Sequence, residues 1–186
     1  MSRRLFVSID LAPELHDAVA ELQEQFLPIP GVRTTDPTQA HVTLKFLGDV
    51  SEDRLYAVEQ ALERGVERAS IDPFVAEFGN FGVFPEFDYI SVIWLGVPVG
   101  GDHMEALHEG IEHEMVELGF EEEGHTFTPH VTIARMEHGE GKAQVQEILR
   151  SERPTAGQMT VEDVSLTESQ MRRDGPEYST VYSVSL

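Results

Sequence analysis

The feature that most constrains how this chain of 186 residues can fold is a triplet, His-Val-Thr, that occurs twice. The first copy opens the stretch HVTLKFLG at 41–48, and the second opens HVTIARM at 130–136. Both stretches are rich in β-branched residues, and polar and apolar residues alternate in them, which predicts half-buried β-strands. Because the copies fall at matching places in the two halves of the chain, we expect the halves to share a similar plan.

The surrounding sequence predicts a mixture of helices and strands. Apolar residues recur at helical spacing in four segments: 13–26, 52–69, 101–119 and 141–152. Strands are predicted at 4–11, 32–35, 40–47, 73–84, 88–97 and 127–136, followed by a hairpin of 158–169 and 177–186. Ser51 is the expected N-cap of the second helix, and Gly119 is expected to close the third. The late hairpin argues against an all-parallel sheet, so we predict one α+β domain over 1–186, with two antiparallel-rich sheets facing each other and helices outside.

Charge separates the two motifs from the rest of the chain. The chain has 34 acidic residues against 13 Lys and Arg, for a formal net charge of −21. Two windows, 37–48 and 124–135, contain no acid, and each holds one His-Val-Thr and one permanent cation, Lys45 or Arg135. This distribution predicts a site that accepts negative charge. Scarce lysine and evenly spread acid favour adaptation to high salt, with an ordinary acidic protein as the alternative.

The composition also limits where such a chain functions. Cysteine is absent, which excludes disulfides and thiolate metal ligands. No stretch approaches the roughly 20 apolar residues of a membrane span. The opening MSRRLFVSIDLAPE lacks the apolar core and cleavage site of a signal peptide. We therefore expect a cytoplasmic protein without a membrane anchor, monomeric and without an obligate protein partner.

Strand alternation assigns the motif residues to faces. One face of the first copy carries His41, Thr43 and Lys45, and the opposite face, directed at the core, carries Val42, Leu44 and Phe46. In the second copy, His130 and Thr132 share a face. Strict alternation points Arg135 away from His130, so Arg135 is expected at a strand end or at a β-bulge if it belongs to the same site.

Two histidines and two threonines around one cavity suit a phosphodiester. One histidine can activate water while the other protonates the leaving oxygen, without a metal ion. Threonine hydroxyls can donate to the nonbridging oxygens, and a cation stabilises the charge of the transition state. A single His-x-Thr is more often structural, but two identical copies in acid-free windows favour a functional pair.

These motifs resemble those of the 2H phosphoesterase superfamily, and within it the LigT-like RNA 2′,3′-cyclic phosphodiesterases. HVTLKFLGDV (41–50) is similar to the first family signature and FTPHVTIAR (127–135) to the second. Further similarity covers RLFVSIDLAPEL (4–15), residues 79–97 and the ending LTESQMRRDGPEYSTVYSVSL. The resemblance implies a two-lobed fold with pseudo-twofold symmetry and a cleft lined by both motifs.

The resemblance also implies an activity and roles for residues. It implies an RNA 2′,3′-cyclic 3′-phosphodiesterase that needs no metal or other cofactor and forms a 2′-phosphate on RNA ends or nucleotides. His41 is then the proton donor to the departing 3′ oxygen, and His130 the proton acceptor that activates water. The residues expected to bind substrate are Thr43, Thr132, Arg135, Lys45 and Phe46.

Several other interpretations remain open. Ligation of RNA, such as tRNA half-molecules, through a 2′-5′ linkage is the reverse of the hydrolysis, and a non-catalytic RNA-end binder is a further alternative. A metal-dependent phosphoesterase is the third. His108 and His113 do not fit a zinc motif, because five residues of helix turn about 500° and separate their side chains, so these histidines are expected on a solvated face. Trp94 is expected in the core.

Overall fold

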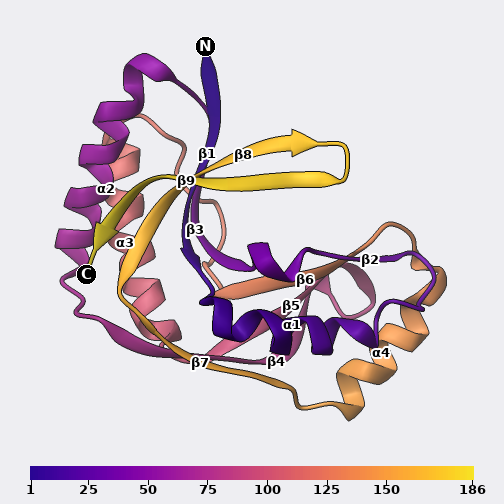
Figure 1. The fold of residues 1–186 in the computed structure, drawn as a ribbon. Helices are drawn as coiled ribbons and strands as arrows, with labels where there is room; N and C mark the ends of the chain where they lie inside the picture. The colour runs from indigo at the N-terminus through magenta and orange to yellow at the C-terminus, as the bar shows by residue number, and fades with distance from the viewer.

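The computed structural model describes all residues, 1–186, and its helices and strands follow the predicted order (Figure 1). The helices are α1 His16–Glu24, α2 Leu55–Ala69, α3 Gly101–Glu117 and α4 Lys142–Ser151. The strands are β1 Ser2–Asp10, β2 Val32–Thr34, β3 His41–Ser51, β4 Phe74–Glu86, β5 Tyr89–Val99, β6 His130–Met136, β7 Thr155–Val161, β8 Asp163–Arg172 and β9 Gly175–Ser185.

Two predicted boundaries are wrong. β3 continues through Gly48, where the strand was expected to end, as far as Ser51. Gly48 has a φ of +74°, which a residue without a Cβ adopts at little cost, and the strand passes through it at a register shift. The predicted strand 158–169 is two strands, β7 and β8, separated by a single residue, Glu162.

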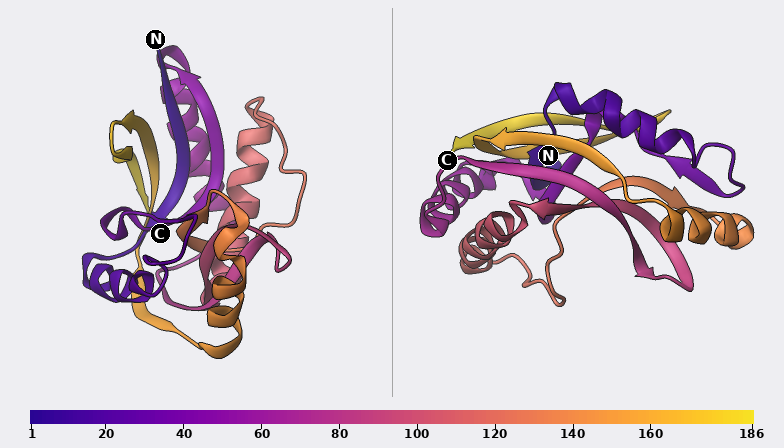
Figure 2. Two further views of the ribbon diagram at one scale, coloured as in Figure 1. Left: turned by 90° about the vertical axis from the view of Figure 1, so that its right-hand side faces the viewer. Right: turned by 90° about the horizontal axis from the view of Figure 1, so that it is seen from below.

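All strands belong to one curled antiparallel sheet. The order is β7-β4-β5-β6-β3-β1-β8-β9, and β2 pairs with β6. The predicted α+β class is therefore confirmed, but the two sheets are continuous at the β3–β6 junction rather than separate. One residue pair, Val42 with Val131, makes that junction. Figure 2 shows the curvature of the sheet.

Each lobe combines strands from both halves of the sequence. The C-terminal strands β8 and β9 extend the sheet of β1 and β3, while β7 extends the sheet of β4, β5 and β6. Helices α2 and α3 pack together on one lobe, and α1 and α4 lie at the other end of the molecule (Figure 1). No helix is long and apolar enough to cross a membrane.

The helix ends agree only in part with the predicted signals. Ser51 precedes a short 3-10 turn that leads into α2, but its side chain makes no capping hydrogen bond. Gly119 follows α3 with a φ of +105°, the left-handed conformation that commonly ends a helix.

The crossing of α2 and α3 depends on two glycines that face each other. A Cβ at Gly110 would overlap the carbonyl oxygen of Gly65 and lie 3.1 Å from the amide nitrogen of Ala69. A Cβ at Gly65 would lie 2.7 Å from Cα of Ile111. The two helix backbones therefore approach more closely than any larger side chain permits.

We expect Gly110→Ala to destabilise the protein by about 1–3 kcal/mol, because the added methyl group forces the helices apart. In an unconstrained helix the same change would stabilise by up to about 1 kcal/mol. Gly139→Ala is the control, since a Cβ there meets nothing within 4 Å. Chemical denaturation of both variants measures the difference, and a Gly110→Ala protein as stable as wild type would contradict this account of the crossing.

Candidate active site

The Val42–Val131 pair brings the two His-Val-Thr motifs together. In the antiparallel register, His41 lies beside Thr132 and Thr43 beside His130, on the face opposite the two buried valines. The two histidines are thus diagonal neighbours, about 7–8 Å apart in a regular ladder. The β3–β6 ladder consists of this pair alone.

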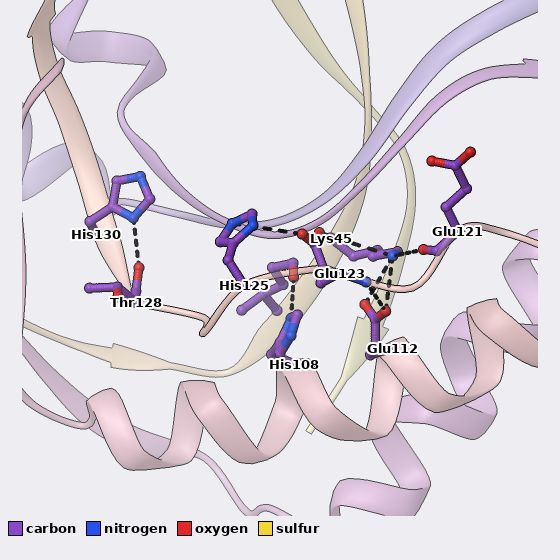
Figure 3. Close-up of polar contacts among 9 residues, drawn as sticks. Lys45, His108, Glu112, Glu121, Glu123, His125, Thr128 and His130 are labelled. Carbon is purple, nitrogen blue, oxygen red and sulfur yellow. Dashed lines mark hydrogen bonds and ion pairs between the residues drawn. The ribbon is translucent and has the colours of Figure 1, made fainter. Parts of the chain in front are cut away.

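Both histidines are held by the same kind of hydrogen bond. Nδ1 of His41 donates to the carbonyl oxygen of Gln39 at 2.9 Å. Nδ1 of His130 donates to the carbonyl oxygen of Thr128 at 2.6 Å (Figure 3). A carbonyl oxygen can only accept, so each Nδ1 carries a proton and each Nε2 is left for chemistry. Nε2 of His41 lies 3.1 Å from the hydroxyl of Thr43.

A β-bulge follows the threonine in each motif. On β3, Thr43 and Lys45 pair with the adjacent residues Ser8 and Val7 of β1, so Leu44 is an extra residue. On β6, Thr132 and Ala134 pair with Trp94 and Ile93 of β5, so Ile133 is an extra residue. The burial sequence of the first six residues is the same in both strands, with two consecutive buried residues at the bulge. Each bulge reverses the alternation of the residues that follow it.

The bulge confirms one sequence prediction. Arg135 lies after the extra residue Ile133, is exposed, and shares the face of His130, as a bulge was predicted to allow. Its charge contributes to lowering the pKa of both His41 and His130, so the guanidinium lies within electrostatic reach of both imidazoles.

The corresponding bulge in β3 places two other residues, Lys45 and Phe46, on faces opposite to those predicted. Lys45 does not share the face of His41, because the bulge at Leu44 turns it toward α3, where its side chain is 3% exposed and lies 2.9 Å from Glu112. Phe46 does not face the core; it is 48% exposed, and the guanidinium of Arg4 lies 5.1 Å from its ring centroid.

Burial dominates the electrostatics of the two histidines. Desolvation lowers the pKa of His41, opposed by its hydrogen bond to Gln39 and by the carboxylate of Asp10, while Arg135 lowers it further. Desolvation also lowers the pKa of His130, opposed by its bond to Thr128, and the nearby His41 and Arg135 lower it further. Only His41 has a carboxylate neighbour, so Asp10 makes the two positions chemically unequal.

Backbone register explains this inequality. Asp10 of β1 pairs with His41, whereas Gly96 of β5 occupies the equivalent place beside His130. The hydroxyl of Ser8 donates to the Asp10 carboxylate at 3.1 Å, which fixes its orientation.

Aromatic side chains that the sequence did not single out flank both histidines. Phe6 and Tyr178 lie 5.0 and 5.1 Å from the ring of His41, measured between centroids. Phe84 and Trp94 lie 4.8 and 5.8 Å from the ring of His130. Trp94 is half-buried beside the site rather than in the core. Its indole lies against Gly82, where any side chain would overlap the ring. Tyr178 and Phe84 gave no periodic signal that separated them from ordinary strand residues.

Gln39 connects the first motif to the β8–β9 hairpin. Its side-chain amide donates to the carbonyl oxygen of Pro176 at 2.9 Å and accepts from the amide of Tyr178 at 2.8 Å. Its own carbonyl oxygen receives the Nδ1 proton of His41. One residue thus orients His41 and holds Tyr178 against it.

The remaining histidine prediction is correct for His113, which is exposed, and wrong for His108. His108 is not on a solvated helix face; it is 8% exposed and its Nδ1 donates to the carbonyl oxygen of Leu44 at 2.7 Å. Across residues 1–186, no three histidine or carboxylate side chains gather in an arrangement that could hold a metal ion.

A pseudo-twofold antiparallel fold with a His-x-Thr half-site on each side of its junction defines the class of two-histidine phosphoesterases. Sequence comparison agrees, since residues 11–173 match the 2′-5′ RNA ligase superfamily. The chain belongs to this superfamily, which includes the LigT-like proteins of the 2H phosphoesterases.

Individual relatives extend along nearly the whole chain. An RNA 2′,3′-cyclic phosphodiesterase of Methanothermobacter thermautotrophicus is 32% identical over 184 residues, which cover 96% of each chain. One of Methanocaldococcus jannaschii is 28% identical over 179 residues, covering 96% of this chain and 98% of the relative. The crystal structure of TT0787 of Thermus thermophilus has a TM-score of 0.81 at 28% identity, over 98% of this chain and 97% of that one. E. coli LigT complexed with 3′-AMP shares the fold, with a TM-score of 0.81 at 21% identity over 100% of this chain and 99% of that one.

We expect the two histidines to make the fold less stable in acid. Both have a pKa below the ordinary value of 6.5 in the folded protein, so the unfolded chain binds more protons as the pH falls through that value. The free energy of unfolding should therefore decrease from about pH 7.5 to about pH 5.5. In the double variant His41→Asn/His130→Asn, the free energy of unfolding should decrease less over the same pH range, as measured by urea denaturation. An equal loss in both proteins would contradict the assignment.

Proposed function

We propose that the protein hydrolyses the 2′,3′-cyclic phosphate of RNA ends or nucleotides to a 2′-phosphate without a metal ion. The observation that carries the proposal is the pair of histidines at one junction, each with Nδ1 fixed by a carbonyl, so that Nε2 is the atom available for proton transfer. The names of the relatives, RNA 2′,3′-cyclic phosphodiesterases, support the same substrate class.

The reaction requires one proton to be taken up and one to be given. In the proposed mechanism, neutral His130 accepts a proton from water at Nε2 as the water oxygen attacks phosphorus. The bond from phosphorus to the 3′ oxygen breaks, and protonated His41 gives its Nε2 proton to that oxygen. The hydroxyls of Thr43 and Thr132 donate to the nonbridging oxygens, and Arg135 stabilises the extra negative charge.

The asymmetry of the site supports these two roles. Asp10 pairs with His41 and favours its protonated form, whereas the charge of His41 disfavours a proton on His130. Burial lowers both pKa values in the free protein, but the negative charge of a bound phosphate would raise them. The first proton to bind is then held on His41, which makes it the donor and leaves His130 as the acceptor.

Phe46 is proposed as a surface for stacking of a base, because it is exposed and the bulge at Leu44 places it on the face of β3 that carries His41. Lys45 is given no contact with substrate, because carboxylates enclose it on the other face. Ligation through a 2′-5′ linkage uses the same groups in reverse, and the superfamily name supports it as a second candidate.

We expect His41→Ala and His130→Ala each to lower kcat for a nucleoside 2′,3′-cyclic phosphate by at least about 10²-fold, because each removes one proton-transfer group. The assay is run in EDTA and high salt, and the product is identified by chromatography. His113→Ala is the matched control, since that side chain is 50% exposed and its polar contacts are with Arg68 and Glu114, away from both motifs.

The outcomes separate the alternatives. A 2′-phosphate formed in EDTA supports the proposal, and a 3′-phosphate contradicts the assignment of donor and acceptor. Binding without turnover identifies an RNA-end binder, and turnover that EDTA abolishes identifies a metal-dependent enzyme. Near-normal kcat in either alanine variant would rule out the two-histidine mechanism.

We further propose a monomer that works in the cytoplasm at high salt. The net charge of −21 supports function at high salt. Salt shortens the Debye length to about 3 Å at 1 M and so weakens the repulsion between the surface charges.

The melting temperature should accordingly rise by several degrees when KCl is increased from roughly 0.1 M to roughly 2 M. An isosmotic sucrose series separates charge screening from a general solute effect. Equal stabilisation by both solutes would argue for an ordinary acidic protein, and sedimentation in the same buffers tests the monomer.

A further inference from the structure

Lys45 is a buried cation that takes no part in the proposed chemistry. Its counterpart, the fourth residue after the second histidine, is Ala134, which is also buried. The duplicated chemistry therefore does not require a cation at this position. Burying an ammonium group is costly unless it is paired and hydrogen-bonded, so position 45 is expected to have a role of its own.

The partners of Lys45 come from α3 and from the segment that connects α3 to β6. Its Nζ lies 2.9 Å from Oε2 of Glu112 and donates to Oε1 of the same carboxylate at 3.2 Å. It also donates to the carbonyl oxygen of Glu121 at 2.6 Å and lies 4.0 Å from the carboxylate of Glu123 (Figure 3). The ammonium group therefore ties the connecting segment to the strand of the first motif.

His108 makes a parallel connection one turn earlier on α3. Its Nδ1 donates to the carbonyl oxygen of the bulge residue Leu44, and its ring stacks on Phe127 with 4.3 Å between centroids and 16° between planes. Glu112 accepts from the backbone amide of Glu123 at 2.8 Å. Residues four apart share a helix face, so His108 and Glu112 both bridge the bulge and the connecting segment.

Backbone hydrogen bonds do not hold this segment in place. Residues 121–129 make no backbone–backbone hydrogen bond. Their bonded main-chain groups are the carbonyl of Glu121, the amide of Glu123 and the carbonyl of Thr128, which pair with Lys45, Glu112 and His130. The segment leads directly into the second motif, so the position of the Thr128 carbonyl depends on side chains of β3 and α3.

We propose that Lys45, His108 and Glu112 form a positioning clamp, which holds the segment before the second motif against the bulge of the first and fixes the Thr128 carbonyl that orients His130. The clamp residues do not touch substrate and act through His130; this inference rests on the function proposed above. Because the strand of one motif anchors the histidine of the other, the two half-sites form together.

The double variant Lys45→Met/Glu112→Leu tests the clamp without leaving a lone buried charge. We expect kcat to fall roughly 10- to 100-fold while KM stays within about threefold, because a misplaced base slows chemistry more than binding. The bond to Thr128 favours protonated His130, so the pKa of His130 should fall as that bond weakens, while that of His41 stays unchanged. NMR titration of the imidazoles in the free protein measures both values.

Three further variants make the result specific. Arg64→Met/Glu114→Leu removes an ion pair of 3.2 Å between α2 and α3 and should leave kcat and the titrations of both histidines unchanged. Lys45→Met/Glu112→Gln restores an acceptor for the Glu123 amide and should recover part of kcat. His108→Phe keeps an aromatic ring against Phe127 but cannot donate to Leu44. Like the double variant, it should lower both kcat and the pKa of His130.

Two outcomes would overturn the clamp. The first is a folded double variant, by circular dichroism, that keeps the wild-type kcat and His130 titration. The second is a fall in kcat that comes with equal pKa shifts of both histidines, or that also appears in the Arg64/Glu114 control. Either result indicates general destabilisation. If the double variant does not fold, the clamp is tested with His108→Phe alone. An unchanged pKa of His130 in that variant would reject the clamp. An inactive wild type would contradict the proposed function, whereas the titration, which needs no substrate, still tests the clamp.

Discussion

The candidate site depends on the pairing of one residue from each lobe, Val42 with Val131. Both valines are buried, so the residues on either side of them must point to the opposite face, and four polar side chains meet there. A longer ladder would keep the two strands about 4.8 Å apart and pack each histidine against the threonine across from it. The ladder consists of a single pair, so this regular cross-strand packing is not imposed on the four groups.

The two bulges determine which further side chains share the face of the two histidines. Without an extra residue in β6, Arg135 would point into the core and the site would lack its exposed cation. The equivalent bulge in β3 has the opposite effect on charge, because it withdraws Lys45 from the cleft and exposes Phe46. One geometric device repeated in both lobes thus gives a cation to one half-site and an aromatic ring to the other.

Local pattern was sufficient to predict the helices, most strands and the four motif residues, since periodicity and β-branching act over a few neighbours. Register and strand exchange between lobes depend on contacts distant in sequence, and no local signal marks the one-residue break at Glu162. The error at Lys45 was avoidable, because the bulge inferred for Arg135 applies to the first copy as well. The error at His108 was avoidable too, since it lies on the face of α3 that carries the buried Met104, Leu107, Ile111 and Met115.

A duplicated scaffold gives two equal histidines, but hydrolysis needs an acid and a base, so residues outside the repeated triplets must create the difference. Asp10 stands beside His41 where Gly96 stands beside His130, which biases the first proton toward one side. The second asymmetry concerns support. The carbonyl that orients His41 belongs to Gln39, whose side chain is bonded to β9, whereas the carbonyl that orients His130 ends a segment without backbone hydrogen bonds. Both histidines change protonation during the reaction while they must keep a fixed geometry. The less supported one is therefore the one for which an added clamp has the larger effect, and the buried Lys45 of the first motif lies where such a clamp is needed.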